Sequence, residues 1–282
     1  MQSTQTGMRE RRQGARPKGQ LDIGQAMAQE EIEILLQPQY SARGDRLVGA
    51  EALCHWHYPD FGTIGGHALF AIACRTGEVP LLSRHVAQRA LAEAAQWPAE
   101  AELRLSLNVT AADLAHPGFA EEFLALLGAS GFPATRLTLE ITEQVLLADL
   151  DHAREQLEQL TARDIRIALD DFGAGFCNFG YLKRLPLHYL KLDRSMVEDV
   201  AKDPRDLAVL RGIVALADAL GLAVIAEGIE SETQRRICAE EGVALYQGFL
   251  RARPMPGPSF ASLIAESVPA PAPIAGPSPH AG

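Results

Sequence analysis

Eight short apolar runs along this chain each carry, at or near their end, a side chain that can bind a metal ion or a water molecule. The runs and these side chains are EILLQPQY with Gln37, VGAEAL with Glu51, LSLNVT with Asn108, RLTLEIT with Glu140, IRIALDDF with Asp170 and Asp171, HYLKLD with Lys191, LAVIAEG with Glu227, and LYQGFL with Gln247. Most runs are rich in Leu, Ile and Val and are apolar at nearly every position. This pattern is typical of strands that helices bury on both faces.

The segments between these runs have helical patterns. Apolar residues recur at helical spacing in two of them, at Leu207, Leu210, Val214 and Ala217 and at Ala153, Leu157 and Leu160. A further helix is expected after Ser231. Strand and helix alternate every 20 to 40 residues or so, which indicates parallel βα units. Eight such units within about 230 residues favour a closed, TIM-type (β/α)8 barrel over an open doubly wound sheet.

In such a barrel, residues at the carboxyl ends of neighbouring strands converge on one rim. Two like charges about 4 Å apart, at an effective dielectric near 20, repel by on the order of 4 kcal/mol, so an acidic rim needs cations. The rim offers oxygen ligands without Cys or His, which indicates Mg²⁺ or Mn²⁺ rather than zinc. The rim carboxylates are Glu51, Glu140, Asp170, Asp171 and Glu227.

Asp170 and Asp171 are adjacent, and successive side chains of a strand point in opposite directions. The two can share one rim only if the strand ends there and the backbone turns. Gly173 and Gly175 permit such a turn.

Composition agrees with one domain of catalytic size. A chain of 282 residues with 47% hydrophobic content can bury a full barrel core. The net charge of -10 argues against a broad surface for long nucleic acid, although bound metals would still admit a small phosphate substrate. The four cysteines lack CxxC spacing, which favours a reduced, cytoplasmic setting. No apolar run approaches 18 residues, so no membrane segment is expected.

The two ends of the chain differ from its body. Residues 1–20 are polar and basic, and we expect a disordered leader there. Residues 268–282 are rich in Ala and Pro, and we expect a disordered tail. Residues 21–267 then form the functional domain.

The chain resembles the EAL family of cyclic-di-GMP phosphodiesterases across roughly residues 28–265. The namesake triplet is Glu51-Ala52-Leu53, and the match continues in the family's order through LSLNVT, LEITE, DDFGAG, YLKRLP, LKLDRS, AEGIE and YQGFL. A triplet by itself carries little information, whereas eight ordered segments at compatible spacing leave little room for chance. The resemblance implies a bacterial source and a barrel whose first strand runs antiparallel to the rest, a detail that periodicity does not show.

The resemblance also implies a role for each rim residue. One metal would be held by Glu51, Asn108, Glu140 and Asp170. Asp170 would bridge to a second metal, held with Asp171 and Glu227. Lys191 would position or polarise the attacking water, and Glu227 would act as the general base.

Further residues resemble positions beside the substrate or behind the site. The substrate-side positions are Gln37, Leu53, His55, Gln247 and Glu230, the last of which also resembles a metal-side acid. Glu143 is similar to the family glutamate that braces the DDFGAG loop. Two metals about 3.5 to 4 Å apart would supply a hydroxide equivalent and neutralise charge, and the implied product is linear pGpG. Lys191 would add a fixed positive charge.

Some residues depart from the family pattern. His55 stands where most members have an Arg that grips a phosphate, and a neutral imidazole lacks the guanidinium fork. One lost charge-assisted hydrogen bond costs about 1.5 to 3 kcal/mol, or roughly 10- to 100-fold in affinity. The loop has Ala174, Phe176, Cys177 and Asn178 where Thr, Tyr and two Ser are usual, which puts coupling between dimerisation and activity in question.

Three functions stay open on the sequence. The first is a phosphodiesterase that uses two Mg²⁺ or Mn²⁺ ions to open cyclic-di-GMP. The second is a receptor or scaffold with little or no catalytic activity that binds the dinucleotide, or a protein partner, through the same mouth. A hydrolase of another phosphodiester is a more distant third. The resemblance also leaves room for a homodimer and for an upstream sensor domain or partner.

Overall fold

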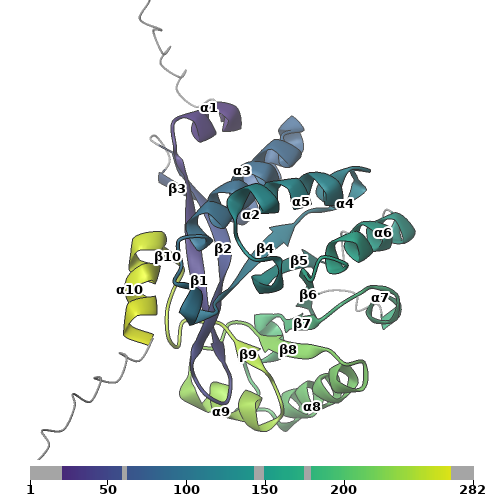
Figure 1. The fold of residues 1–282 in the computed structure, drawn as a ribbon. Coiled ribbons are helices and arrows are strands. Elements are labelled where there is room, and N and C mark those ends of the chain that lie inside the picture. Colours follow the sequence, from purple (N-terminus) through teal and green to yellow (C-terminus); the bar gives the residue numbers. More distant parts are fainter. Residues whose placement is uncertain (1–20, 59–61, 143–148, 175–178, 268–282) are drawn as a thin grey trace, which may run out of the picture.

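The computed structural model describes residues 21–58, 62–142, 149–174 and 179–267. Within these ranges ten strands form one sheet, in the order β10-β1-β9-β8-β7-β6-β5-β4-β2-β3, and pairing of β1 with β2 closes it. Figure 1 shows the resulting ring of strands with the helices outside it. The closed barrel predicted from the sequence is confirmed. The expected leader and tail lie outside the described residues.

The eight apolar runs form the eight strands of the barrel. The strands are β1 (Ile32–Ser41), β2 (Leu47–Tyr58), β4 (Arg104–Val109), β5 (Leu137–Thr142), β6 (Arg166–Phe172), β7 (Tyr189–Leu192), β8 (Ala223–Ala226) and β9 (Leu245–Tyr246). Strands β2 and β4 to β9 pair in parallel, whereas β1 is antiparallel to both of its barrel neighbours, β2 and β9. The antiparallel first strand is therefore confirmed. Two short strands flank the barrel, β3 (Gly62–Gly65) beside β2 and β10 (Met255–Pro256) beside β1.

Helices cover the outside of the ring (Figure 1). They are α1 (Ile23–Ala28), α2 (Gly66–Thr76), α3 (Val79–Ala94), α4 (Ala111–Ala115), α5 (Phe119–Ser130), α6 (Leu150–Thr161), α7 (Phe179–Arg184), α8 (Pro204–Ala219), α9 (Glu232–Glu240) and α10 (Gly257–Ser267), with single 3-10 turns at Ala99–Ala101, Ala134–Arg136 and Arg194–Met196. Ser231 caps α9 with a reciprocal capping box, as the sequence signal predicts. None of the described helices combines the length and the apolar character needed to cross a bilayer.

Strand β2 is longer than the apolar run that predicts it. It pairs with β4 only from Gly49 to Ala52 and then continues to Tyr58 as an antiparallel ribbon with β1 and β3. Glu51 therefore lies where the strand leaves the barrel, not where the strand ends. A separate apolar cluster supports this ribbon, and the fully buried Trp56 in it donates from its indole nitrogen to Glu31 over 2.8 Å.

The main core lies between the strands and the helices, and a much smaller apolar cluster fills the inside of the barrel. The inner cluster contains Ala168, Tyr189 and Ile225. Side chains alternate along each strand, so the residues two positions before or after this inner layer also point inward. Polar side chains therefore occupy both ends of the barrel interior.

Candidate metal site at the barrel mouth

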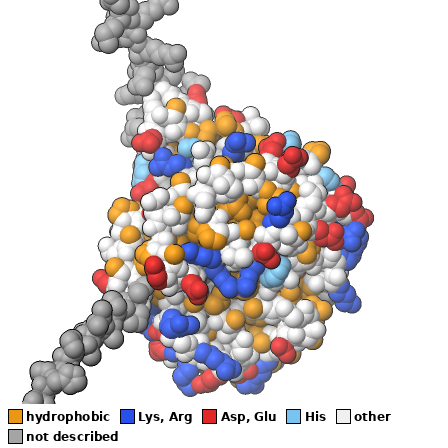
Figure 2. Space-filling model, in the orientation of Figure 1, with side chains coloured by type: hydrophobic (Ala, Val, Ile, Leu, Met, Phe, Trp, Pro, Cys, Tyr) orange, Lys and Arg blue, Asp and Glu red, His pale blue; other side chains and the backbone are white. Residues whose placement is uncertain are grey.

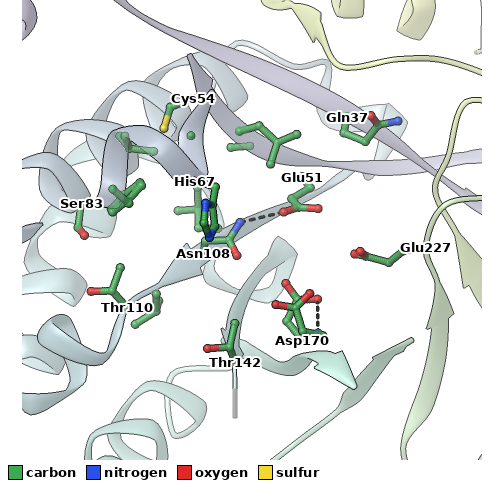
Figure 3. A pocket seen from close by; sticks show the side chains of 18 of the residues that line it. Gln37, Glu51, Cys54, His67, Ser83, Asn108, Thr110, Thr142, Asp170 and Glu227 are labelled. Atoms are coloured by element: carbon green, nitrogen blue, oxygen red, sulfur yellow. Dashed lines mark hydrogen bonds between the residues drawn. The ribbon is translucent and has the colours of Figure 1, made fainter. Parts of the chain in front are cut away.

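A cavity of about 820 Å³ opens at the carboxyl ends of the parallel strands. The sequence-predicted residues that line it are Gln37, Glu51, Leu53, Asn108, Asp170, Asp171, Glu227, Glu230 and Gln247. Figure 3 shows Glu51, Asp170 and Glu227 around one space at its floor, with Ser83 and Thr110 along another wall. The barrel thus brings together side chains that are far apart in the sequence. We call this cavity the mouth.

Lys191 lies beneath the floor of the mouth and is completely buried. Its Nζ atom is 2.5 Å from Glu140, 2.6 Å from Glu227, 3.0 Å from Asp170 and 3.4 Å from Glu51. Burial by itself would lower the pKa of this lysine, but the surrounding carboxylates outweigh burial and hold the pKa well above its ordinary value. Lys191 is therefore a permanent positive charge at the centre of the acidic cluster.

The pKa values of the carboxylates around Lys191 are shifted in different directions. Burial raises the pKa of Glu227 to about 8, although the Lys191 charge opposes the shift. Burial and the charge of Glu51 raise the pKa of Glu140 well above its ordinary value. Glu51 differs because the Lys191 charge and hydrogen bonds from Gln247 and Asn108 overcome the effect of burial and lower its pKa. One lysine is thus too little positive charge for the whole cluster.

Three carboxylates form a group that could hold a metal ion. Ligand oxygens of Glu51, Glu140 and Asp170 all lie within 4.8 Å of one another. The Oε1 atom of Glu140 is buried and has no hydrogen-bond partner, which normally carries a large desolvation cost. A divalent cation would remove that cost, and an oxygen-only donor set suits Mg²⁺ or Mn²⁺. Asn108 lies at the edge of this group and donates to Glu51 over 2.8 Å.

Asp170 and Asp171 both reach the mouth because the strand is irregular at this point. The register of β6 against β7 shifts between Leu169 and Phe172, and Asp171 itself has a left-handed backbone with φ of 56°. The sequence indicated that the turn would use Gly173 and Gly175; Gly173 does have φ of 102°, but the turn begins two residues earlier. Gly175 lies outside the described residues. Only Asx and Gly residues adopt this backbone at low cost, so Asp suits the position locally as well as chemically.

The glutamines of the mouth orient its carboxylates. Gln247 donates to Glu51 over 2.7 Å and to Glu227 over 3.0 Å. Gln39, which the sequence reasoning missed, donates to the Gln247 side-chain oxygen over 3.0 Å and so fixes which end of that amide faces the acids. Gln39 follows Gln37 by two residues on one strand face, and that spacing is the signal that could have found it. Gln37 donates to the Ala252 carbonyl over 2.8 Å.

Glu230 lies on the rim of the mouth and pairs with Arg194 over 2.9 Å. Arg194 is a second residue that the sequence reasoning missed, although it stands in the LKLDRS segment. Gly228 has φ of 66°, and a Cβ atom there would approach the Arg194 side chain to within 2.5 Å. The glycine therefore lets Arg194 pass close to the backbone. Asp193 caps the following turn by accepting from the Ser195 amide.

His55 is half-buried in the ribbon beyond the barrel, opposite Glu33 of β1 and Gly65 of β3. It shares a strand face with Glu51 and Leu53, but the described residues that line the mouth do not include it. Some loop predictions cannot be placed. Glu143, Phe176, Cys177 and Asn178 lie outside the described residues.

The pKa shifts predict a pH-dependent effect of Mg²⁺ on stability. Without metal, Glu227 and Glu140 keep protons in the folded state that they lose in the unfolded state, so the free energy of unfolding falls as pH rises from about 4.5 towards about 8. Mg²⁺ favours the ionised carboxylates. We therefore expect Mg²⁺ to raise the melting temperature more at about pH 8 than at about pH 5. An equal rise at both pH values would contradict this expectation, and Asp170→Asn should reduce the rise at either pH.

The fold and the site define a class: a (β/α)8 barrel with one reversed strand, whose mouth holds a cluster of carboxylates suited to a divalent cation. The family model of the EAL domain matches residues 20–254. The chain belongs to the EAL domain family.

Curated relatives and solved structures agree with this membership. The chain is 33% identical over 246 residues to the Pseudomonas aeruginosa protein named bifunctional diguanylate cyclase/cyclic di-GMP phosphodiesterase MucR, covering 86% of this chain and 36% of that protein. It is 32% identical over 237 residues to cyclic di-GMP phosphodiesterase NbdA of the same species, covering 83% of this chain and 30% of that protein. The chain thus spans well under half the length of these relatives.

Two solved structures are similar along most of the chain. The structure titled PaMucR phosphodiesterase, c-di-GMP complex, has a TM-score of 0.79 and 33% identity, covering 85% of this chain and 98% of that one. The structure of the EAL enzyme Bd1971 in its cAMP- and cyclic-di-GMP-bound form has a TM-score of 0.81 and 28% identity, covering 86% of this chain and 67% of that one.

Proposed function

We propose that this chain is a metal-dependent phosphodiesterase that opens one ester of cyclic-di-GMP to give linear pGpG. The observation that carries the proposal is the buried Lys191 with four carboxylates within 3.4 Å of its Nζ atom, at the floor of a cavity of about 820 Å³. A protein that only binds an anionic dinucleotide has no evident use for so many acids beneath the ligand. The names of the relatives provide the substrate class.

The residues of the mouth fit a role in holding divalent cations. In this proposal, Glu51, Asn108, Glu140 and Asp170 would hold one Mg²⁺ or Mn²⁺ ion. Asp170, Asp171 and Glu227 would hold a second. When bound, the two ions supply a hydroxide equivalent for attack on phosphorus and neutralise charge on the phosphodiester.

The protein's own groups complete the proposed reaction. Glu227 accepts the proton of the attacking water. Its pKa of about 8 without metal would leave it largely protonated near neutral pH, and nearby cations favour the carboxylate that a base requires. Lys191 stabilises negative charge as it develops on the phosphate or on the water. Gln247 keeps the Glu227 carboxylate aimed into the mouth, while Gln37, Leu53 and Glu230 border the substrate.

The test of this function is incubation of the purified chain with cyclic-di-GMP and Mg²⁺ or Mn²⁺, followed by chromatography. We expect pGpG to appear with either metal and not with chelator. If the dinucleotide binds but is not hydrolysed under any of these conditions, the chain is a receptor instead. Hydrolysis of unrelated phosphodiesters at equal rates would overturn the assignment of substrate.

A receptor or scaffold is the second candidate because of one specific observation. By the resemblance to the family, His55 stands where most members have an arginine that binds a phosphate, and His55 does not line the mouth among the described residues. A weakened phosphate grip reduces the binding energy available to align the ester for attack. Retention of the full set of acids and of Lys191 nevertheless favours the enzyme.

Replacement of His55 by Arg should strengthen substrate binding. The longer, permanently charged side chain can donate a forked pair of hydrogen bonds to a phosphate. We expect KM to fall roughly 10- to 100-fold with little change in kcat. The matched control is His57→Arg, one pleat further from the barrel, where the exposed His57 pairs with Glu33 over 2.7 Å. An unchanged KM for His55→Arg would mean that this position does not face the phosphate.

The partners other than the substrate stay predictions. A homodimer is one such prediction. A sensor segment in a longer protein is another, and it is compatible with a chain that covers 36% and 30% of the two curated relatives. Glu143 and residues 175–178 belong to the loop region expected to couple dimerisation to activity, and they lie outside the described residues. The cytoplasmic setting is likewise a prediction.

A further inference from the structure

The barrel has a second polar cavity at the end opposite the mouth. Its volume is about 320 Å³, and its wall includes Gln39, Arg46, Arg104, Ser106, Thr138 and Tyr189. Arg104 and Tyr189 are the first residues of β4 and β7, so the cavity opens at the amino ends of the parallel strands. We call this cavity the base cavity.

The base cavity lies directly under the catalytic layer because of strand alternation. Ser106, Thr138 and Tyr189 each precede a residue of that layer by two positions, namely Asn108, Glu140 and Lys191. The inner apolar cluster, to which Tyr189 belongs, separates the two ends of the interior. The base cavity is thus distinct from the mouth.

Two arginines converge on the hydroxyl of Tyr189. Arg104 donates to this oxygen from Nη1, and Arg166, the first residue of β6, donates to it from Nη1 over 2.6 Å. Arg166 also lies over the Tyr189 ring, with 5.8 Å between its central carbon and the ring centroid. A neutral hydroxyl accepts two hydrogen bonds but offsets no charge, so two positive charges are held only a few ångströms apart.

No carboxylate balances these arginines among the described residues. None of Arg46, Arg104 and Arg166 forms an ion pair with a described acidic side chain, unlike Lys191 with its four partners. Glu102 lines the base cavity but is exposed, and its charge acts on Arg136. The positive charge also acts on His188. Burial lowers the pKa of this histidine, and the charge of Arg166 lowers it further.

The surface agrees with this distribution of charge. On the face drawn in Figure 2, Lys and Arg side chains gather over the middle of the strand ring of Figure 1, while elsewhere on that face acidic and basic side chains are interspersed. Arginines at one opening of the barrel are expected to place basic side chains over the ring in this way. The positive end and the acidic mouth therefore lie at opposite ends of one interior.

We propose that the base cavity binds a small oxyanion of the phosphate type, either free or as the phosphate group of a mononucleotide. Guanidinium groups donate paired hydrogen bonds to such anions, and Ser106 and Thr138 add hydroxyl donors on the cavity wall. The volume of about 320 Å³ suits a small ligand better than the dinucleotide for which the mouth has about 820 Å³. The site does not depend on the function proposed for the mouth.

The test is calorimetric titration of the purified chain with inorganic pyrophosphate, without added divalent metal. We expect one site per chain, with binding weakened roughly 10- to 100-fold by Arg104→Gln and by Arg166→Gln. Arg46→Gln, at an exposed position on the hairpin between β1 and β2, should weaken binding without affecting folding. A parallel titration with guanosine monophosphate distinguishes a free anion from a nucleotide phosphate, and binding of either at these arginines supports the site.

Two matched variants show where the anion binds. Arg205→Gln alters an exposed arginine of α8, and Arg194→Gln alters the arginine at the rim of the mouth. We expect pyrophosphate affinity to be unchanged in both. Absence of binding by the wild-type chain, or loss of binding in Arg194→Gln but not in Arg46→Gln, Arg104→Gln or Arg166→Gln, would overturn the proposal. Because no cyclic-di-GMP is present, either result leaves the function of the mouth to its own test.

Discussion

Replacement of Glu227 by Gln is expected to lower kcat for cyclic-di-GMP hydrolysis by about 10²- to 10⁴-fold, the usual contribution of a general base. The amide has the size of the carboxyl group but cannot accept the proton of the attacking water. Glu227 Oε1 lies 2.6 Å from Lys191 and 3.0 Å from Gln247, so the side chain is held at the floor of the mouth before any substrate binds. Substrate binding should persist, because the rest of the mouth is intact.

This prediction is checked by initial rates from chromatography and by calorimetric binding of the dinucleotide in the same preparation. Glu266→Gln is the matched control, because it makes the same chemical change at an exposed position on α10 and should leave kcat unaltered. Turnover at the wild-type rate in Glu227→Gln would refute the assignment of the base. Loss of binding together with turnover would instead show that the carboxylate serves mainly to hold the site together.

Replacement of Lys191 by Met should remove turnover and also destabilise the metal-free protein. Removal of one partner from a buried ion pair usually costs about 3 to 5 kcal/mol, because the remaining charge is left without compensation. Here four carboxylates would lose their shared cation, and Glu140 and Asp170 are both buried. We expect a lower melting temperature that Mg²⁺ largely restores, since the metal replaces the lost charge. Turnover should stay low even with Mg²⁺, because the lysine acts on the reacting groups.

The two effects of Lys191→Met separate when unfolding and turnover are measured with and without Mg²⁺. Lys202→Met is the matched control, because Lys202 is exposed and pairs only with Asp199 among the described acids, over 2.8 Å. A metal-free Lys191→Met protein as stable as the wild type would show that the carboxylates are protonated there and need no cation. Full turnover with Mg²⁺ would limit the lysine to a structural role.

Both predictions rest on a balance of charge at the mouth. One buried lysine and a set of carboxylates with opposed pKa shifts leave the cluster short of positive charge, which divalent cations can supply. The base cavity has the reverse imbalance, with arginines and no paired acid among the described residues. The interior of one barrel thus separates the two signs of charge at its two ends.

Strand positions could be predicted from the sequence because each barrel strand is a short apolar run. The register of those runs against one another could not. The run VGAEAL gave no indication that β2 continues to Tyr58, because the ribbon beyond Ala52 is stabilised by the packing of Trp56 in a cluster with residues of α1 and α2, which lie outside that run. Similarly, the positive φ of Asp171 follows from a shift of β6 against β7, which no local pattern encodes.

The candidate site could also be predicted in part from the sequence. Residues at strand ends converge in any parallel barrel, so Glu51, Asp170 and Glu227 could be placed on one rim. The residues that contact these side chains and their neighbours from behind could not be predicted. Gln39 reaches Gln247, and Arg194 reaches Glu230, only because neighbouring strands and loops lie at particular offsets.

The sequence by itself determined that the chain forms an acidic barrel whose strand ends gather oxygen ligands, because apolar periodicity and strand-end placement are properties of short segments. Only the tertiary structure decided that Lys191 lies among four of these acids and that Arg104 and Arg166 meet at one tyrosine at the far end. The physical reason is that distances between side chains on different strands depend on the shared tilt and stagger of the closed sheet. That geometry is set when all eight strands pack together.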